Sequence, residues 1–132
     1  MSEKTTILIA DDEAEILSMY KQKLTHAGFA VLTASNGEEA CVAIKESKPD
    51  LVLMDIKMPI MDGMTAQQKL HSDPETQYIR VVFLTAFSNH AADQLRDVNF
   101  TKQSGALGFI QKGEDLNTLV SKVREYLTVP VE

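Results

Sequence analysis

Short apolar runs recur along the chain and are separated by longer segments in which apolar residues return every three or four positions. The runs are rich in Ile, Val, Leu and Phe and do not alternate with polar residues, which is typical of strands covered on both faces. They predict five buried β-strands, at residues 7–10, 29–32, 51–54, 81–84 and 107–110, the last run being the weakest.

The segments between and after these runs predict helices. Apolar residues at helical spacing follow the first run and end at Gly28, a residue type that commonly stops a helix. A shorter stripe begins near Asn36, weaker stripes lie at 64–70 and 91–104, and the clearest includes Leu116, Val123 and Leu127. Five repeats of strand and helix predict an α/β fold, a doubly wound parallel five-stranded sheet with right-handed crossovers.

Length and charge narrow the possible functions. A chain of 132 residues suits one domain, which we expect to span residues 1–132. The net charge is −6 and the 13 basic residues are scattered, so we expect no direct nucleic-acid binding. No apolar stretch is long enough to cross a bilayer and no signal peptide is visible, so we expect a cytoplasmic protein without membrane insertion.

The single cysteine, Cys41, excludes an internal disulfide, and we interpret it as a core residue.

Polar residues follow four of the five predicted strands. Asp11 and Asp12 end the first, Asp55 the third and Thr85 the fourth, while Lys112 follows the fifth. In an open doubly wound sheet the functional site lies outside the carboxyl ends of the strands. The second strand brings no reactive group, which an outer position in the sheet would explain. The pattern therefore predicts one site at one edge of the sheet.

Each of these residues also has an ordinary structural explanation. The acids could cap a helix, Asp55 could be a loop acid, Thr85 a satisfied hydroxyl and Lys112 a solvated cation. Their convergence from four strand ends favours a site. Three crowded carboxylates repel unless a cation compensates them, and an oxygen-only donor set suits Mg²⁺ or a similar divalent cation such as Mn²⁺. With a lysine opposite, the site is suited to a phosphoryl group.

These motifs resemble the receiver domain of two-component response regulators over nearly all of residues 5–128. The motifs that carry the resemblance are Ile-Leu-Ile-Ala-Asp-Asp at 7–12, Asp-Leu-Val-Leu-Met-Asp-Ile-Lys-Met-Pro at 50–59, Met-Asp-Gly at 61–63, Thr85-Ala86 and Lys112. The resemblance implies a flavodoxin-like sheet with strand order 2-1-3-4-5. It also implies membership of a phosphorelay that transfers phosphate between proteins.

The resemblance assigns roles to the acidic residues. Asp55 would accept the phosphoryl group and become an aspartyl phosphate. Asp12 would bind Mg²⁺ directly, and Asp11 mainly through water. The backbone carbonyl of Lys57 and the Asp55 carboxylate would complete the protein's share of the metal ligands.

The resemblance also implies how a signal enters and leaves. Thr85 and Lys112 would bind the phosphoryl oxygens. Phe109 would be the switch aromatic that fills the space left when Thr85 moves inward, which would reshape the surface formed by the fourth helix, the fifth strand and the fifth helix. The donor would be a sensor histidine kinase or a histidine phosphotransfer protein, and a downstream target protein would bind the phosphorylated form. We expect a signalling phosphoacceptor that assists its own phosphorylation and dephosphorylation, not an enzyme. It would be a monomer or weak dimer, and a stand-alone receiver if the chain is complete.

Two features depart from the family. Glycine, Gly113, follows Lys112 where the family usually has a proline, so the local backbone is expected to differ. The segment between Thr85 and Gly105 is longer than usual, which affects a loop that borders the expected site.

Two other functions fit the pattern less well. A phosphatase of the haloacid dehalogenase type also uses a strand-end aspartate and Mg²⁺, but it needs an acid two residues later, where this chain has Lys57. A flavodoxin-like cofactor carrier needs a loop that cradles phosphate after the first strand. Here Asp11 and Asp12 stand in that place and would repel a flavin phosphate.

Overall fold

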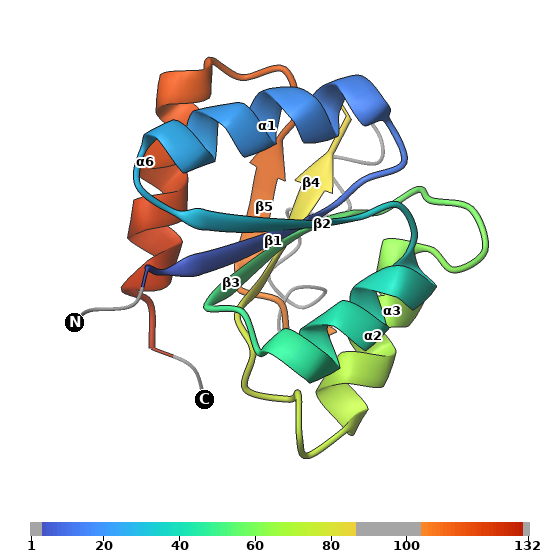
Figure 1. Ribbon diagram of the computed structural model, residues 1–132. Helices are drawn as coiled ribbons and strands as arrows, with labels where there is room; N and C mark the ends of the chain where they lie inside the picture. Colours follow the sequence, from blue (N-terminus) through green and yellow to red (C-terminus); the bar gives the residue numbers. More distant parts are fainter. Residues whose placement is uncertain (1–3, 87–103, 131–132) are drawn as a thin grey trace.

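The computed structural model describes residues 4–86 and 104–130 (Figure 1). Strands and helices alternate as expected within each of these two ranges. The elements are β1 (Thr6–Ala10), α1 (Ala14–His26), β2 (Ala30–Ala34), α2 (Gly37–Ser47), β3 (Leu51–Asp55), α3 (Gly63–Ser72), β4 (Val81–Thr85), β5 (Gly108–Gln111) and α6 (Leu116–Leu127). The helix expected at 91–104 falls almost wholly outside the described residues, as do His90 and most of the long segment after Thr85.

All neighbouring strands of the sheet are parallel, and their order is β2-β1-β3-β4-β5. The expected fold class and strand order are therefore confirmed, including the outer position of β2. The chain reverses its direction of winding between β1 and β3, which is where an open α/β sheet leaves a crevice at its carboxyl edge.

Helices cover the sheet from both sides, with α1 and α6 on one face and α2 and α3 on the other (Figure 1). The residues buried beneath α1 and α6 include Ile7, Ile9, Leu51, Leu53, Val82, Leu84 and Ile110. Those buried beneath α2 and α3 include Leu8, Val52, Met54, Val81 and Phe83. The inner strands β1, β3 and β4 thus carry apolar side chains on both faces, which explains why their sequences do not alternate.

The expectation that every strand is covered on both faces is wrong for β2. The strand begins at Ala30, one residue later than expected, and continues to Ala34. Leu32 is 38% exposed and Thr33 is also exposed. Because β2 has a neighbour on one side only, helices centred on the inner strands leave its outer residues in water.

The helix ends follow the local signals in the sequence. Gly28, just past α1, has a φ of 104°, a conformation that glycine adopts without steric cost. Asn36 caps α2 by accepting a hydrogen bond from the Glu39 N–H at 2.8 Å. Asp62 caps α3 in the same way, accepting from the Thr65 N–H at 2.7 Å.

The loop between β3 and α3 is held against its surroundings by close backbone approaches. The Gly37 N–H at the start of α2 donates to the Met61 carbonyl at 2.8 Å, and the Gly63 N–H donates to the Ile56 carbonyl at 2.8 Å. A Cβ atom at Gly37 would overlap the Met61 carbonyl oxygen, and one at Gly63 would overlap that of Asp55. Glycine at both positions therefore lets this loop pack against α2 and against the end of β3.

Cys41 is half-buried, with its Sγ 3.8 Å from the Ala66 carbonyl of α3, so it packs between α2 and α3 at the border of the core instead of within it. His26 and His71 are exposed. Within residues 4–86 and 104–130, no helix combines the length and the apolar character needed to cross a bilayer.

Truncation of a core leucine should cost much more stability than truncation of an edge leucine. Leu53 is fully buried beneath α1 and α6, so Leu53→Ala should lower the free energy of unfolding by about 3 kcal/mol. Leu32→Ala, the matched control on β2, should lower it by less than about 1 kcal/mol because the side chain is partly in water. Urea unfolding measures both, and equal losses would contradict the edge position of β2.

Candidate functional site

The carboxyl ends of four strands bring the expected polar residues to one edge of the sheet. Asp55 and Thr85 are the last residues of β3 and β4, and Asp11 and Lys112 directly follow β1 and β5. The Asp11 N–H donates to the Ala34 carbonyl at the end of β2 at 3.0 Å, which continues the sheet pairing. The structure thus brings together the strand-end residues that the sequence singled out.

Strand alternation decides from which side each group enters the site. Asp55 lies two residues after Leu53, on the face covered by α1 and α6. Thr85 lies two residues after Phe83, on the face covered by α2 and α3. The acid and the hydroxyl therefore approach the edge from opposite sides of the sheet.

The Lys112 ammonium group joins the acids. Its Nζ lies 2.7 Å from Asp11 Oδ2 and 3.1 Å from Asp55 Oδ2. The Asp11 and Asp55 side chains are 0% and 7% exposed, and that of Lys112 is 9% exposed. A buried cation between two buried carboxylates partly offsets their repulsion, and its loss would leave both acids uncompensated.

Burial raises the pKa of the Asp55 carboxyl to about 6; the charge of Asp11 adds to the rise and Lys112 opposes it. Burial alone would lower the pKa of Lys112, but its hydrogen bonds to Asp11 and Asp55 outweigh that effect and raise it. Above pH 6 the site therefore holds an ionised Asp55 beside a lysine that remains protonated.

Asp11, Asp12 and Asp55 form a cluster that could hold a metal ion, because one carboxylate oxygen from each lies within 4.8 Å of the others. Asp12 is exposed, whereas the other two carboxylates are buried. The donor atoms are all oxygens, which fits a hard cation such as Mg²⁺. The residues present therefore fit the expected metal.

Backbone contacts hold the fourth and fifth strand ends together. The Lys112 N–H donates to the Thr85 carbonyl at 2.7 Å, and Thr85 pairs in register with Gln111. Phe109 pairs with Phe83 and is half-buried against the face covered by α2 and α3. The fifth strand runs from Gly108 to Gln111, one residue later than the expected 107–110, and Phe109 lies within it. Phe109 still lies diagonally across from Thr85 on the same face.

Lys57 and Gly113 flank the site, one with an exposed side chain and the other with an unusual backbone conformation. Lys57 lies two residues after Asp55 with its side chain exposed. Gly113 has a φ of 89°, which the ring of a proline, fixed near −65°, cannot adopt. The backbone after Lys112 thus takes a path that a proline would not permit, as the sequence suggested.

One contact of the site was missed from the sequence. Glu13 Oε1 lies 3.2 Å from Lys112 Nζ, although the Glu13 side chain is 60% exposed. The Glu13 N–H also donates to Asp11 Oδ1 at 2.8 Å. The run of three acids at residues 11–13 could have indicated this contact. Glu13, the last of them, is however also typical of the acids found at the start of a helix.

Comparison with known proteins assigns the chain to a family. The model of the response regulator receiver domain matches residues 7–124. The chain is 35% identical to the protein PilH of Pseudomonas aeruginosa over 121 residues, covering 92% of this chain and 96% of PilH. It is 32% identical to sporulation initiation phosphotransferase F of Bacillus subtilis over 127 residues, covering 96% and 95% of the two chains.

Other relatives are longer than this chain. It spans 49% of the probable transcriptional regulator ycf27 of Porphyra purpurea, at 32% identity, and 25% of the response regulator PleD of Caulobacter vibrioides, at 36% identity. The similarity to these longer proteins therefore concerns only the part of each that aligns with this chain.

Solved structures agree with the sequence match. A putative response regulator from Chloroflexus aurantiacus superposes with a TM-score of 0.84 at 28% identity, covering 96% of this chain and all of the other. The haloacid dehalogenase alternative finds no support in these matches. The family match over most of the chain, the strand order and the relatives of similar length together show that this chain belongs to the response regulator receiver domains of two-component signal transduction.

Proposed function

We propose that this receiver takes a phosphoryl group on Asp55 from a histidine kinase or histidine phosphotransfer protein, in a reaction that depends on Mg²⁺. The observation that carries the proposal is the convergence of the buried Asp55 with Lys112, 3.1 Å away, and with two further acids at one edge of the sheet. A relative named a phosphotransferase supports the same class of chemistry.

Asp55 would act as the nucleophile. An oxygen of its carboxylate attacks phosphorus, an O–P bond forms, and the N–P bond of the phosphohistidine breaks. The electron pair of that bond returns to the imidazole, which leaves with the histidine-bearing protein. Because the pKa of Asp55 is about 6, the carboxylate is ionised and ready for attack at neutral pH.

Two cations would balance the charge that the phosphoryl group brings. Lys112 already lies at the Asp55 carboxylate and could exchange one of its acidic partners for a phosphoryl oxygen. A bound Mg²⁺ would neutralise negative charge on the transferring oxygens. Asp12 and Asp55 would hold it directly and Asp11 mainly through water, with the Lys57 carbonyl as a further ligand.

Thr85 and Phe109 would carry the signal away from Asp55. The Thr85 hydroxyl would donate a hydrogen bond to a phosphoryl oxygen and move toward it. Phe109, diagonal to Thr85 on the same face and only half-buried, would fill the space left behind. The surface around β5 and α6 would change, and a downstream target protein would bind there.

The chain would therefore be a signalling phosphoacceptor that assists its own phosphorylation and dephosphorylation. PilH and phosphotransferase F, each covered almost completely by this chain, support a role in which the receiver domain itself passes on the signal. A single receiver domain over residues 1–132, with its core at 5–128, remains a prediction, as does a monomer or weak dimer.

Replacing the acceptor should abolish phosphorylation. Asp55→Asn preserves the shape of the side chain and should retain the fold, but the amide is a far poorer nucleophile. Incubation with acetyl phosphate and Mg²⁺ followed by intact mass spectrometry should show one added phosphoryl group on the wild type and none on the variant. Asp50→Asn, just before the other end of β3, is the matched control and should be labelled normally. Labelling of Asp55→Asn at the wild-type rate would rule out Asp55 as the acceptor.

Magnesium affinity should depend on pH and on both acids of the pair. Protonation of Asp55 removes a ligand, so affinity should fall as the pH drops below about 6 and level off above it. Asp11→Ala should weaken binding about tenfold, and Asp12→Ala should weaken it more because that acid would bind directly. Calorimetric titration at several pH values measures both effects. Equal and negligible losses would contradict a metal-binding role for Asp11 and Asp12.

Removal of the Thr85 hydroxyl should uncouple phosphorylation from the output. Thr85→Ala should still accept a phosphoryl group, but amide chemical shifts around Phe109 should change much less on addition of a phosphoryl mimic. Thr128→Ala, at the exposed end of α6, should behave like the wild type. Changes near Phe109 as large in Thr85→Ala as in the wild type would contradict the coupling.

A further inference from the structure

Ile60, in the loop between β3 and α3, has an unusual backbone conformation. Its φ is 69°, and the Met61 N–H donates to the Pro59 carbonyl at 2.7 Å across it. This is a γ-turn with a positive φ at its centre, the rarer and more strained of the two γ-turns. Positive φ is especially unfavourable for a β-branched residue, so glycine or asparagine would fit this position better.

Nothing in the described part of the chain compensates for that strain by packing. The Ile60 side chain is 77% exposed, the highest value among the large hydrophobic residues found exposed there. The loop itself is firmly held, since the Gly37 and Gly63 N–H groups bond to the carbonyls of Met61 and Ile56 on either side. The fold thus presents an isoleucine to solvent on a rigid support.

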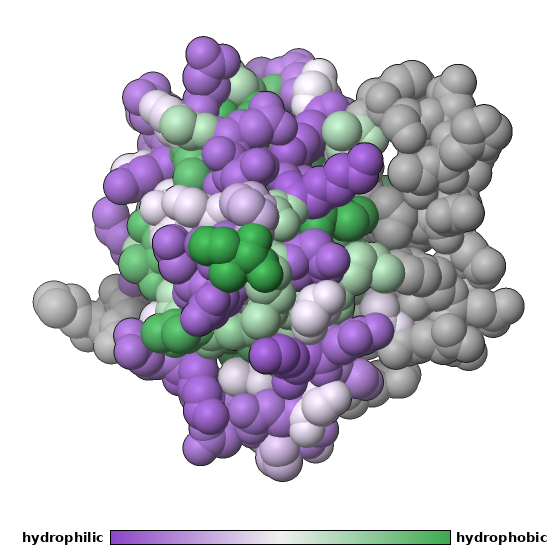
Figure 2. Space-filling model, turned by 90° about the vertical axis from the view of Figure 1, so that its right-hand side faces the viewer, coloured by the Kyte–Doolittle hydropathy of each residue, from purple (hydrophilic) through white to green (hydrophobic). Residues whose placement is uncertain are grey.

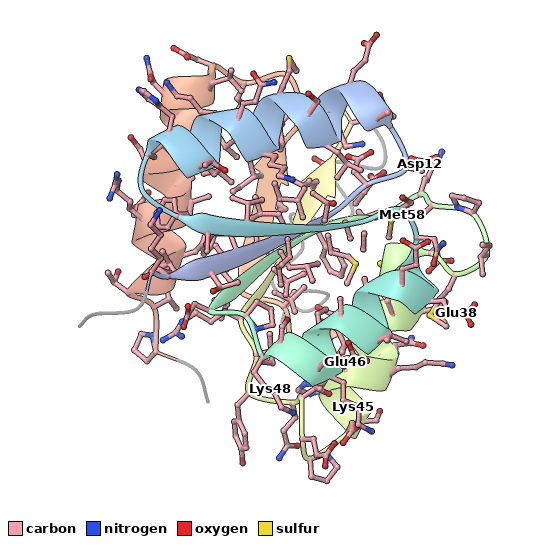
Figure 3. All side chains as sticks on the ribbon, in the orientation of Figure 1. Asp12, Glu38, Lys45, Glu46, Lys48 and Met58 are labelled. Carbon is pink, nitrogen blue, oxygen red and sulfur yellow. The ribbon has the colours of Figure 1, made fainter. Side chains whose placement is uncertain are left out.

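Ile60 lies at the functional edge of the sheet, five residues after Asp55 in a loop that packs against the Asp55 backbone at Gly63. Figure 2 faces this end of the molecule and shows hydrophobic side chains near the centre of the view, bordered by hydrophilic ones. Figure 3 shows Asp12, Met58 and Glu38 at the same end. An apolar group therefore projects from the loop that packs beside Asp55.

The charged residues around this end are mostly acidic. Asp12, Glu13, Glu38 and Asp62 are exposed, and Lys57 is the exposed cation of the same loop. A protein that covers the site would therefore meet one apolar projection within a negatively charged rim. A complementary surface has an apolar hollow with basic side chains at its border.

We propose that Ile60 is an apolar anchor for the protein that donates the phosphoryl group, seated in such a hollow near the donor's phosphohistidine. The inference rests on the proposed function. Asp55 is 5% exposed, so a protein donor has to bring its imidazole against this edge and cover the loop that carries Ile60. A downstream target would bind around β5 and α6 and has no need to cover it.

The test uses variants that suit the backbone better than isoleucine does. Ile60→Asn and Ile60→Gly both tolerate a positive φ, so their thermal unfolding midpoints should equal or exceed that of the wild type. Tyr78→Asn is the matched control, because Tyr78 is 62% exposed and lies before β4, at the opposite edge of the sheet.

Two phosphoryl donors distinguish a loss of donor binding at Ile60 from a loss of phosphorylation at Asp55. Acetyl phosphate needs no protein contact and should label wild type, both Ile60 variants and Tyr78→Asn at rates equal within twofold. The protein probes are the phosphorylated histidine kinases and histidine phosphotransfer proteins encoded in the genome of origin, of which the fastest donor to the wild type is used. Transfer from this protein should slow about tenfold in both Ile60 variants, because an isoleucine side chain is no longer buried on contact. The Tyr78 control should be unaffected.

Several results would overturn the anchor. Kinase transfer that is equally fast in the Ile60 variants, or equally slowed in Tyr78→Asn, would do so. A lower unfolding midpoint in both variants would show that Ile60 packs within its own chain. Self-association lost in the variants without any change in transfer would identify a second copy as the occupant. A wild type labelled by acetyl phosphate but by no kinase and no phosphotransfer protein would also exclude a protein donor. Failure of acetyl phosphate and of every protein donor to label the wild type would overturn the proposed function, and the anchor with it.

Discussion

The ion pairs of Lys112 with Asp11 and Asp55 are the interaction on which this edge of the molecule depends. Two buried carboxylates lie at the ends of adjacent strands, and the lysine that follows β5 brings the positive charge that lets them stay close. The contact also joins β1 and β3 to a strand at the far side of the sheet. Without it, folding would bury acids that water solvates much better.

The same ion pairs leave the acids only partly compensated, so the site could accept a further cation or a phosphoryl group. Burial and the charge of Asp11 raise the pKa of Asp55, which shows that one lysine does not fully compensate the acids. A divalent cation would relieve the remaining repulsion, and a phosphoryl group would give Lys112 a new partner. The same charged side chains therefore affect both stability and function. Asp11, Asp55 and Lys112 must neutralise one another for folding, and they are also the groups that would bind metal and phosphate.

The loop between β3 and α3 combines a firmly held backbone with an exposed isoleucine. Glycines at 37 and 63 allow backbone contacts too close for any side chain, and these contacts hold the loop beside Asp55. On this support Ile60 takes a strained conformation and projects into solvent. Strain that no internal packing offsets is most simply understood through a partner, because residues in rare conformations cluster where proteins act.

The sequence by itself determined the fold class, the outer position of β2 and the convergence of Asp11, Asp55, Thr85 and Lys112. Apolar runs that do not alternate need cover on both faces, and parallel strands bring their carboxyl ends to one edge. Only the tertiary structure decided that Glu13 reaches Lys112 and that Leu32 remains partly in water. Glu13 and Lys112 are 99 positions apart, and the loop that carries Ile60 is held by a backbone hydrogen bond from α2 to Met61. Such features depend on which distant groups meet, and local residue patterns carry no information about that.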